Sequence, residues 1–218
     1  MNYQNIFESD FSLPKKVCIL APGPNGKAHY AEIPRDFCLI AVANAVLIPE
    51  VGPDIWMMNH ADQEWYERAE SSFEGICIFG DAAMKIRPEL PGKKVCYYFE
   101  PPVEPLNRDM SASIEGVIRI GGSIVGCALQ LGYNFGAKEI LLCGVDMSGD
   151  GYWNGTANTQ VKHGETWSTV ERLNPLIRWL WERKGISVYT LSPTKLNVRR
   201  FVHKQISAED ETPIQRFA

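Results

Sequence analysis

Closely spaced cysteines are missing from this sequence. Its six cysteines stand far apart with no Cys-x-x-Cys pair, and at least four lie inside apolar runs. Such cysteines are typical of reduced core residues in a cytosolic protein, and they argue against a zinc site or a disulfide framework. They are Cys18, Cys38, Cys77, Cys96, Cys127 and Cys143.

The chain also lacks a basic excess and a membrane-spanning run. Its formal net charge of -4 argues against a general nucleic-acid surface, because such a surface needs a dense basic footprint. No uninterrupted apolar segment approaches the length of a membrane span, and the first ten residues carry acid where a signal peptide needs base. These absences predict a soluble, cytoplasmic protein without a transmembrane segment.

The chain has the length and composition of one globular domain. The 218 residues, 45% of them hydrophobic, suffice for one sizeable core. Short apolar runs alternate with helical or polar stretches, which predicts a single α/β domain of the Rossmann-like kind with a mostly parallel sheet. We expect residues 1–14 to be a loose lead-in, 15–205 to form the nucleotide-binding domain and 206–218 to be a mobile tail.

Seven apolar runs have the length expected of buried parallel strands. They cover residues 17–21, 37–43, 54–58, 76–79, 95–99, 140–145 and 186–191. Helices are predicted at 62–72, between Ser123 and Gly136, before Gly185, and at 194–205. For the helix before Gly185, Pro175 leaves two interpretations open: a capping box at Ser168 with a kink at the proline, or a start at Asn174.

The central part of the chain carries the strongest functional signal. A Gly121-Gly122-Ser123 turn precedes a helix, and Ser123 is a plausible N-cap. Backbone amides at such a helix start point outward, where a diphosphate can accept them. The following strand ends at Asp146, and ligands of open α/β sheets bind at the carboxyl ends of the strands.

Three other segments are expected at the same edge of the sheet. Residues 22–26 form a tight turn after the first strand, where mononucleotide folds place a phosphate loop, although a plain connecting turn fits the same residues. Asn44 and Asn59 end the next two strands; each carboxamide can read a base or ribose edge, although asparagine is also a common turn residue. Residues 147–166 are long and polar, and their aromatics Tyr152 and Trp153 favour a lid that orders over a substrate.

These segments resemble the bacterial CMP-sialic-acid-dependent lipooligosaccharide sialyltransferases. The similarity lies in Ala21-Pro-Gly-Pro-Asn-Gly, in Ile33-Pro-Arg-Asp-Phe37, and in the Arg119-Ile-Gly-Gly-Ser and Gly-Val-Asp146 motifs. The central motifs are also similar to a wider group, which holds the motility accessory factors and the archaeal 6-hydroxymethylpterin diphosphokinases. The resemblance covers about residues 17–60 and 117–195.

The resemblance implies nucleotide-binding and sugar-binding residues position by position. One set matches the loop that approaches the nucleotide, a second matches asparagines that contact CMP and the sugar, and a third matches the turn beside them. These sets are Gly23, Pro24 and Asn25; Asn44 and Asn59; and Gly121, Gly122 and Ser123.

The resemblance also implies a catalytic base and a phosphate-binding tyrosine. His163 is the nearest candidate for the histidine that deprotonates the acceptor hydroxyl, although it lies a few residues earlier than the family's spacing places it. Tyr152 is the candidate for one phosphate-binding tyrosine, and Ser148 occupies the approximate place of the other. Ala21 and Pro22 replace the family's usual Gly-Asn, so the phosphate loop is altered.

The implied function is that of a glycosyltransferase. It would transfer a sialic-type sugar from a CMP-activated nonulosonic acid to a glycan or small-molecule acceptor. This reaction would need no cofactor and no nucleic-acid partner. Whether the protein forms a homo-oligomer is left open. One alternative is a magnesium-dependent diphosphokinase acting on a pterin-like alcohol, with Asp146 and Asp150 as metal ligands. The other is a nucleotide-binding relative that kept the fold and lost the chemistry.

Overall fold

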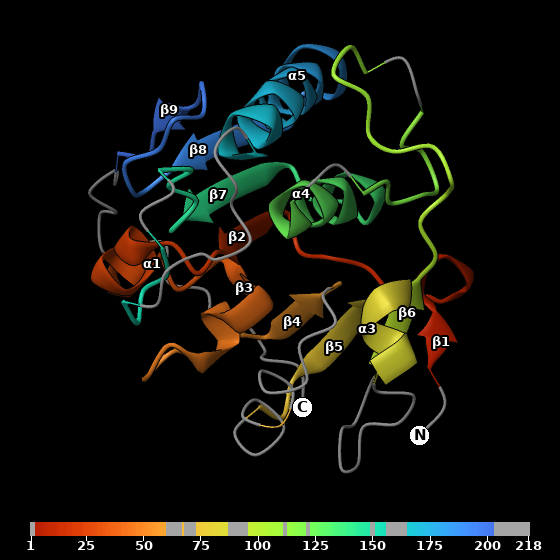
Figure 1. The fold of residues 1–218 in the computed structure, drawn as a ribbon, viewed down its shortest axis with the longest axis horizontal. Coiled ribbons are helices and arrows are strands. Elements are labelled where there is room, and N and C mark those ends of the chain that lie inside the picture. The colour runs from red at the N-terminus through yellow and green to blue at the C-terminus, as the bar shows by residue number, and fades with distance from the viewer. Residues whose placement is uncertain are drawn as a thin grey trace, which may run out of the picture.

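The computed structural model describes residues 3–59, 67, 73–86, 96–110, 113–120, 123–148, 151–155 and 165–202. These residues form a parallel β-sheet in the order β1-β6-β5-β4-β3-β2-β7-β8-β9, with helices against it (Figure 1). Every strand pair is parallel. The prediction of a single α/β domain with a Rossmann-like parallel sheet is confirmed.

The strands are short and the helices vary in length. The strands are β1 Gln4–Asn5, β2 Lys16–Leu20, β3 Cys38–Val42, β4 Ile55–Met58, β5 Ile76–Gly80, β6 Cys96–Phe99, β7 Glu139–Cys143, β8 Ser187–Thr190 and β9 Arg199–Arg200. The α-helices are α1 Pro24–His29, α3 Asp81–Ile86, α4 Ile124–Asn134 and α5 Glu165–Lys184, and the 3-10 helices are η1 Ile6–Glu8, η2 Tyr30–Glu32 and η3 Ala43–Leu47.

The strand order reverses between β2 and β7. From β2 the chain adds β3, β4, β5 and β6 on one side, and then returns to add β7, β8 and β9 on the other. The connections that leave the carboxyl ends of β2 and β7 therefore run in opposite directions across the sheet. In open parallel sheets, ligands bind at this kind of reversal.

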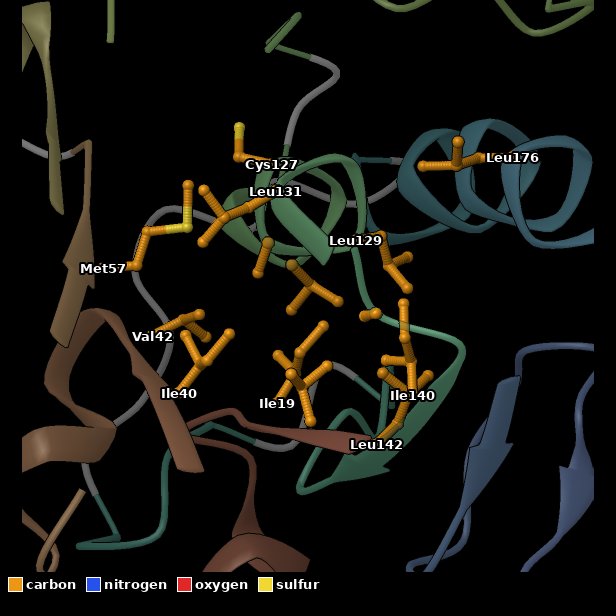
Figure 2. Close-up of a cluster of buried hydrophobic side chains, with 14 of the residues drawn as sticks. Ile19, Ile40, Val42, Met57, Cys127, Leu129, Leu131, Ile140, Leu142 and Leu176 are labelled. Carbon is orange, nitrogen blue, oxygen red and sulfur yellow. The ribbon is translucent and has the colours of Figure 1, made fainter. Parts of the chain in front are cut away.

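Both faces of the sheet are buried, because alternate strand residues point to opposite sides. Ile19, Ile40 and Leu142 belong to the hydrophobic cluster under α4 and α5, which Figure 2 shows with Leu129 and Leu176. The intervening residues join a second cluster with side chains of η3 and α3. Burial on both faces explains why the strands read as continuous apolar runs.

Helix α4 has the ends that its sequence predicts. The Ser123 Oγ accepts a hydrogen bond from the backbone N–H of Val125 at 3.2 Å, so Ser123 is the N-cap. The helix ends at Asn134, and Gly136 follows with a φ of +102°. A residue without Cβ adopts this backbone conformation at little cost, which is why glycine suits the helix end.

Helix α5 begins earlier than either interpretation of its sequence placed it. It starts at Glu165 and continues through Pro175, so starts at Ser168 and Asn174 are both wrong. The Asn174 side chain accepts from the backbone N–H of Asn197 at 2.8 Å. The buried face of α5 stabilises the helix despite the proline. This face consists of Val170, Leu173, Leu176, Ile177 and Leu180.

The chain ends also differ from expectation. Within the predicted loose lead-in 1–14, residues 3–14 pack against the domain: β1 pairs with β6, Ile6 is fully buried, and Leu13 N–H donates to the Phe135 carbonyl at 2.8 Å. A two-residue strand is too short to show a periodic pattern. The helix predicted at 194–205 is wrong where the structure describes it, since β9 lies there. The helix predicted at 62–72, apart from residue 67, and the tail 206–218 lie outside the described residues.

Candidate functional site

The loops that follow β2 and β7 are bonded together at the carboxyl edge of the sheet. Ala21 N–H donates to the Cys143 carbonyl at 2.8 Å, and Gly23 N–H donates to the Gly144 carbonyl at 3.0 Å. Gly144 has a φ of +69°. A Cβ atom at Gly144 or Gly23 would collide with backbone of the opposite loop, so the close approach requires both glycines.

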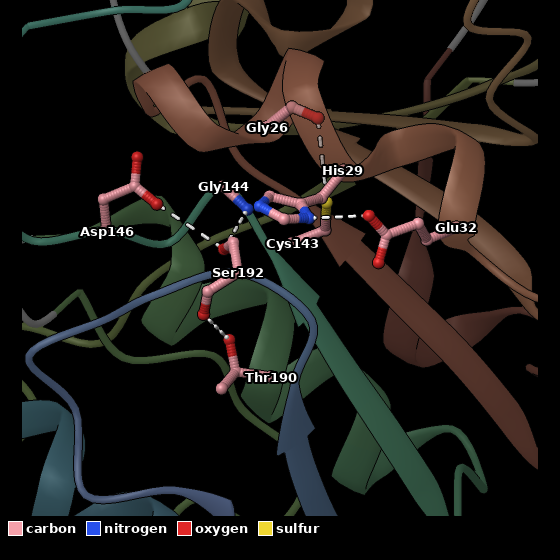
Figure 3. A network of polar contacts seen from close by, with 8 residues as sticks. All are labelled: Gly26, His29, Glu32, Cys143, Gly144, Asp146, Thr190 and Ser192. Atoms are coloured by element: carbon pink, nitrogen blue, oxygen red, sulfur yellow. Dashed lines mark hydrogen bonds and ion pairs between the residues drawn. The ribbon is translucent and has the colours of Figure 1, made fainter. Parts of the chain in front are cut away.

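Asp146 is the side chain that braces these loops. It is only 6% exposed, and its Oδ2 accepts from the Asn25 backbone N–H at 2.9 Å. Its Oδ1 accepts from the Ser192 hydroxyl at 3.5 Å, while the Ser192 Oγ accepts from the Gly144 N–H at 2.9 Å (Figure 3). Asp146 thus joins the loops that follow β2, β7 and β8.

Burial raises the pKa of Asp146 above its ordinary value. Hydrogen bonds from Asn25 and Ser192, and the positive charge that His29 can carry, act in the opposite direction. The His29 Nδ1 lies 2.9 Å from Glu32 Oε1, and Figure 3 shows the imidazole between Glu32 and the Ser192 side of the network. Burial therefore desolvates Asp146, and the hydrogen bonds and the charge of His29 offset only part of the effect on its pKa.

The loop after β2 differs from the predicted turn. Helix α1 begins inside it, with Gly23 as the N-cap and Pro24 as the first helical residue, so residues 22–26 are not simply a tight turn. Pro24 suits this position because its ring fixes φ near the helical value. The amides of Gly23 and Asn25 are bonded to the β7 loop, and Gly26 N–H donates to the Gly23 carbonyl at 2.9 Å.

These bonds leave the loop without amides for a ligand. Pro22 and Pro24 have no N–H, and the other three amides of the segment donate within the chain. Gly23, Pro24 and Asn25 lie at the edge where the sequence placed them. Any anion bound there must nevertheless take its hydrogen bonds from side chains or from other segments.

The two strand-end asparagines lie at the same edge, on neighbouring strands. Asn44 lies in η3 directly after β3 and is 3% exposed; Asn59 directly follows β4. Each side chain has a buried Oδ1 atom with no hydrogen-bond partner within the described part of the chain. A buried polar atom without a partner costs about 1–3 kcal/mol, so native proteins usually supply one.

The backbone around these asparagines is itself well fixed. The Trp56 indole N–H donates to the Ala43 carbonyl at 3.0 Å, next to Asn44. The Asn59 side chain packs so closely against Gly80, at the end of β5, that a Cβ there would overlap it. The two orphan oxygens are therefore held in place by strand ends.

Residues 151–155 lie against the loop that follows β2. Trp153 N–H donates to the Pro22 carbonyl at 2.9 Å, and Lys27 Nζ lies 5.7 Å from the centroid of the Trp153 ring. The Trp153 Nε1 atom is buried and has no hydrogen-bond partner among the described residues. Of the predicted lid at 147–166, its last two residues belong instead to α5.

The structure brings together part of the site that the sequence predicts. Gly23, Asn25 and Asp146 are in contact, and Ser123 caps the helix that leads into the amino end of β7. Tyr152 lies next to Trp153, beside the loop after β2. The other predicted site residues, His163, Gly121, Gly122 and Asp150, lie outside the described residues.

Sequence reasoning missed three side chains at this edge. Trp153 was taken only as a lid aromatic, and Ser192 and His29 were not considered. Ser192 follows the last predicted strand as Asp146 follows the one before, so the same strand-end signal could have found it. His29 gave no such signal, because its place depends on where α1 packs.

Five of the six cysteines are buried, and Cys38 is partly buried. Cys18, Cys127 and Cys143 are buried thiols, and burial raises the pKa of Cys127 and of Cys143 to about 12. Thiols of this kind are poor nucleophiles and poor metal ligands. Within the described part of the chain, no three side chains of the metal-binding types come together.

Comparison with solved structures places the fold. The sialyltransferase CstII from Campylobacter jejuni, in complex with the substrate analogue CMP-3FNeuAc, matches with a TM-score of 0.50 and 15% sequence identity. The match covers 82% of this chain and 81% of that chain. The chain has a sialyltransferase-like fold.

A CstII structure in complex with cytidine-5'-monophosphate matches with a TM-score of 0.46 and 17% identity, over 84% of this chain and 82% of that one. No family model and no curated protein matches the sequence. At these identities the likeness concerns the fold, and the links to motility accessory factors and diphosphokinases stay predictions. None of the described helices is long and apolar enough to cross a membrane.

Proposed function

We propose that the protein binds a CMP-activated nonulosonic acid and transfers its sugar to an acceptor hydroxyl. The observation that carries the proposal is the pair of buried amide oxygens of Asn44 and Asn59 at the carboxyl edge of the sheet, which have no hydrogen-bond partner among the described residues. Both are acceptors, and a nucleoside presents the matching donors as its ribose hydroxyls and, in cytosine, an exocyclic amino group.

The position of these oxygens supports a nucleotide. They directly follow β3 and β4, on one side of the strand-order reversal at β2 and β7. Parallel sheets bind nucleotides across such a reversal. The sialyltransferase whose fold the chain shares was itself solved with a CMP-sugar analogue.

The transfer breaks the bond between the anomeric carbon and the CMP phosphate oxygen. The acceptor oxygen forms the new bond to that carbon, its proton passes to a base, and CMP leaves with the bonding electron pair. Such a step needs a base near the acceptor hydroxyl and hydrogen-bond donors for the phosphate. By resemblance, His163 is the proposed base and Tyr152 a proposed phosphate ligand.

The magnesium-dependent alternative finds less support, because it needs Asp146 as a metal ligand. Both Asp146 oxygens already accept hydrogen bonds from the chain, and burial raises the pKa of the carboxyl group. Burial disfavours the charged form of this carboxyl group, which weakens it as a ligand for a hard cation. The hydrogen bonds by which Asp146 joins the three loops explain its buried position without a metal.

Calorimetric titration with CMP in EDTA, and separately with ATP and magnesium, tests the proposal. We expect CMP to bind without metal, and CMP-sialic acid to be consumed when an acceptor is supplied. Binding of ATP with magnesium in place of CMP would favour diphosphoryl transfer. The proposal is wrong if CMP does not bind, whereas CMP binding without sugar transfer would favour a non-catalytic relative.

A further inference from the structure

The loop after β2 cannot hold a phosphate through its own backbone. All its amides between Pro22 and Gly26 are either absent or bonded within the chain. A phosphate placed at the edge of β2 therefore requires donors from side chains that reach this loop. The described residues offer such groups on the segment that packs against it.

Trp153 and Lys27 are the side chains in question. Trp153 is fixed to the loop by its bond to the Pro22 carbonyl, and its indole N–H has no acceptor among the described residues. Lys27, from the last turn of α1, places its exposed ammonium group 5.7 Å from the indole ring centroid. A positive charge thus lies over the indole ring that carries the N–H donor.

We propose that Trp153 and Lys27 bind the phosphate of the nucleotide, the indole N–H as hydrogen-bond donor and the ammonium group as counter-charge. This assignment rests on the proposed function, because it names the phosphate contacts of the same site. The pair takes over the role that free loop amides have in other mononucleotide folds.

Two features favour an anionic oxygen over another acceptor. Lys27 supplies positive charge next to the indole, and a hydrogen bond to an ionised oxygen is stronger than one to a neutral oxygen. Because the Nε1 atom is buried while the Trp153 side chain as a whole is partly exposed, binding of an oxygen there requires the ring or its neighbours to move. A purely packing role would need the aromatic ring but not its N–H.

The first test compares CMP with cytidine, which lacks the phosphate. Trp153→Phe keeps an aromatic ring against Lys27 and removes the N–H. We expect it to weaken CMP binding about tenfold, the loss typical of one hydrogen bond to a charged group, and to leave cytidine binding unchanged. Lys27→Gln should weaken CMP binding by a smaller factor and reduce its dependence on salt.

Trp181→Phe is the matched control, because Trp181 is 42% exposed near the far end of α5. It should bind CMP as the wild-type protein does. If Trp153→Phe binds CMP like Trp181→Phe, the assignment is wrong. Equal losses for CMP and cytidine would also overturn it, because they would indicate a packing role.

A second measurement separates this assignment from the proposed function. Nuclear magnetic resonance of the ¹⁵N-labelled protein resolves indole N–H signals, and Trp153→Phe identifies the one from Trp153. We expect this signal to move with CMP and with inorganic phosphate but not with cytidine. If CMP does not bind but phosphate moves the signal, the proposed function fails and the anion site stands. No movement with CMP or phosphate overturns the site.

Discussion

The backbone N–H of Asn25 donates to the Asp146 Oδ2 at 2.9 Å, across 121 residues of sequence. The bond fixes the first turn of α1 against the end of β7, at the point where the strand order reverses. A buried carboxylate in this position stabilises the packing of these segments, whether or not it takes part in chemistry. Substitutions at Asp146 therefore act on stability first.

Asp146→Ala should lower the free energy of unfolding by about 2–3 kcal/mol, because it leaves the Asn25 N–H and the Ser192 hydroxyl without their acceptor. Urea unfolding followed by circular dichroism measures the change. Ser192→Ala is the graded comparison, since it removes only the longer 3.5 Å bond to Asp146 and the acceptor of Gly144 N–H. A loss below that of Ser192→Ala would contradict the bracing role of Asp146.

The pH dependence of stability follows from the raised pKa of Asp146. A carboxyl group whose pKa is higher in the folded than in the unfolded protein favours folding while protonated, and this contribution is lost as pH rises through the folded pKa. Asp146→Asn does not titrate. The wild type should therefore lose stability relative to Asp146→Asn as pH rises from about 4 towards neutrality.

Urea titrations of both proteins at several pH values measure this difference, and the other titrating groups largely cancel in it. If the difference in unfolding free energy between the two proteins does not change with pH, or if the wild type gains stability relative to Asp146→Asn as pH rises, burial does not dominate the pKa of Asp146. Ionic strength is held constant, because the charge of His29 also acts on this carboxylate.

Gly144→Ala should destabilise the protein more than Gly185→Ala. Both glycines have a positive φ, +69° and +65°, so each alanine costs about 1–2 kcal/mol of backbone strain. At Gly144 the new Cβ also meets Ala21 and Gly26 backbone, whereas nothing lies within 4 Å at Gly185. Equal losses of unfolding free energy would show that the β2 and β7 loops can separate without cost.

The sequence predicted the inner strands well and the edges poorly. Strands such as β3 and β7 are apolar because both faces of the sheet are covered, and this leaves a clear run of residues. The two-residue strands β1 and β9 leave no such pattern. The start of α5 was missed because the capping-box pattern favours Ser168 and Pro175 favours a start at Asn174, whereas the helix begins at Glu165 and continues through the proline.

Part of the site could be read from strand ends, and part could not. The position of Asp146, Asn44 and Asn59 at one edge could be predicted because polar residues directly after buried strands gather there. The bond from Asn25 to Asp146 uses one of the loop amides and joins segments that are distant in the sequence. Local sequence patterns do not predict such a contact. The same holds for the orphan N–H of Trp153, which no local pattern reveals.

Pro175→Ala should stabilise the protein. The alanine restores a backbone N–H in the interior of α5 and removes a ring that interferes with the preceding turn. We expect a gain of about 1–3 kcal/mol in the free energy of unfolding, measured by urea denaturation. A loss of stability would mean that the buried face of α5 packs correctly only with the proline in place.

Asn59→Ala should separate binding from stability, because its buried Oδ1 has no partner among the described residues. Removing an unsatisfied acceptor costs the folded protein little, but removing a nucleotide contact should weaken CMP binding about tenfold. Calorimetry with CMP and urea unfolding measure the two effects on the same variant. Asn44→Ala should behave in the same way.

Asn134→Ala is the matched control, since that carboxamide is fully used inside the fold. Its Nδ2 donates to the carbonyls of Ile114, Val117 and Gln130 at 2.9–3.1 Å, and its Oδ1 accepts from Gly116 N–H at 2.8 Å. This variant should lose stability and keep the CMP affinity of its folded fraction. If Asn59→Ala instead resembles it, losing stability while binding CMP normally, the Asn59 oxygen is part of the scaffold and the nucleotide lies elsewhere.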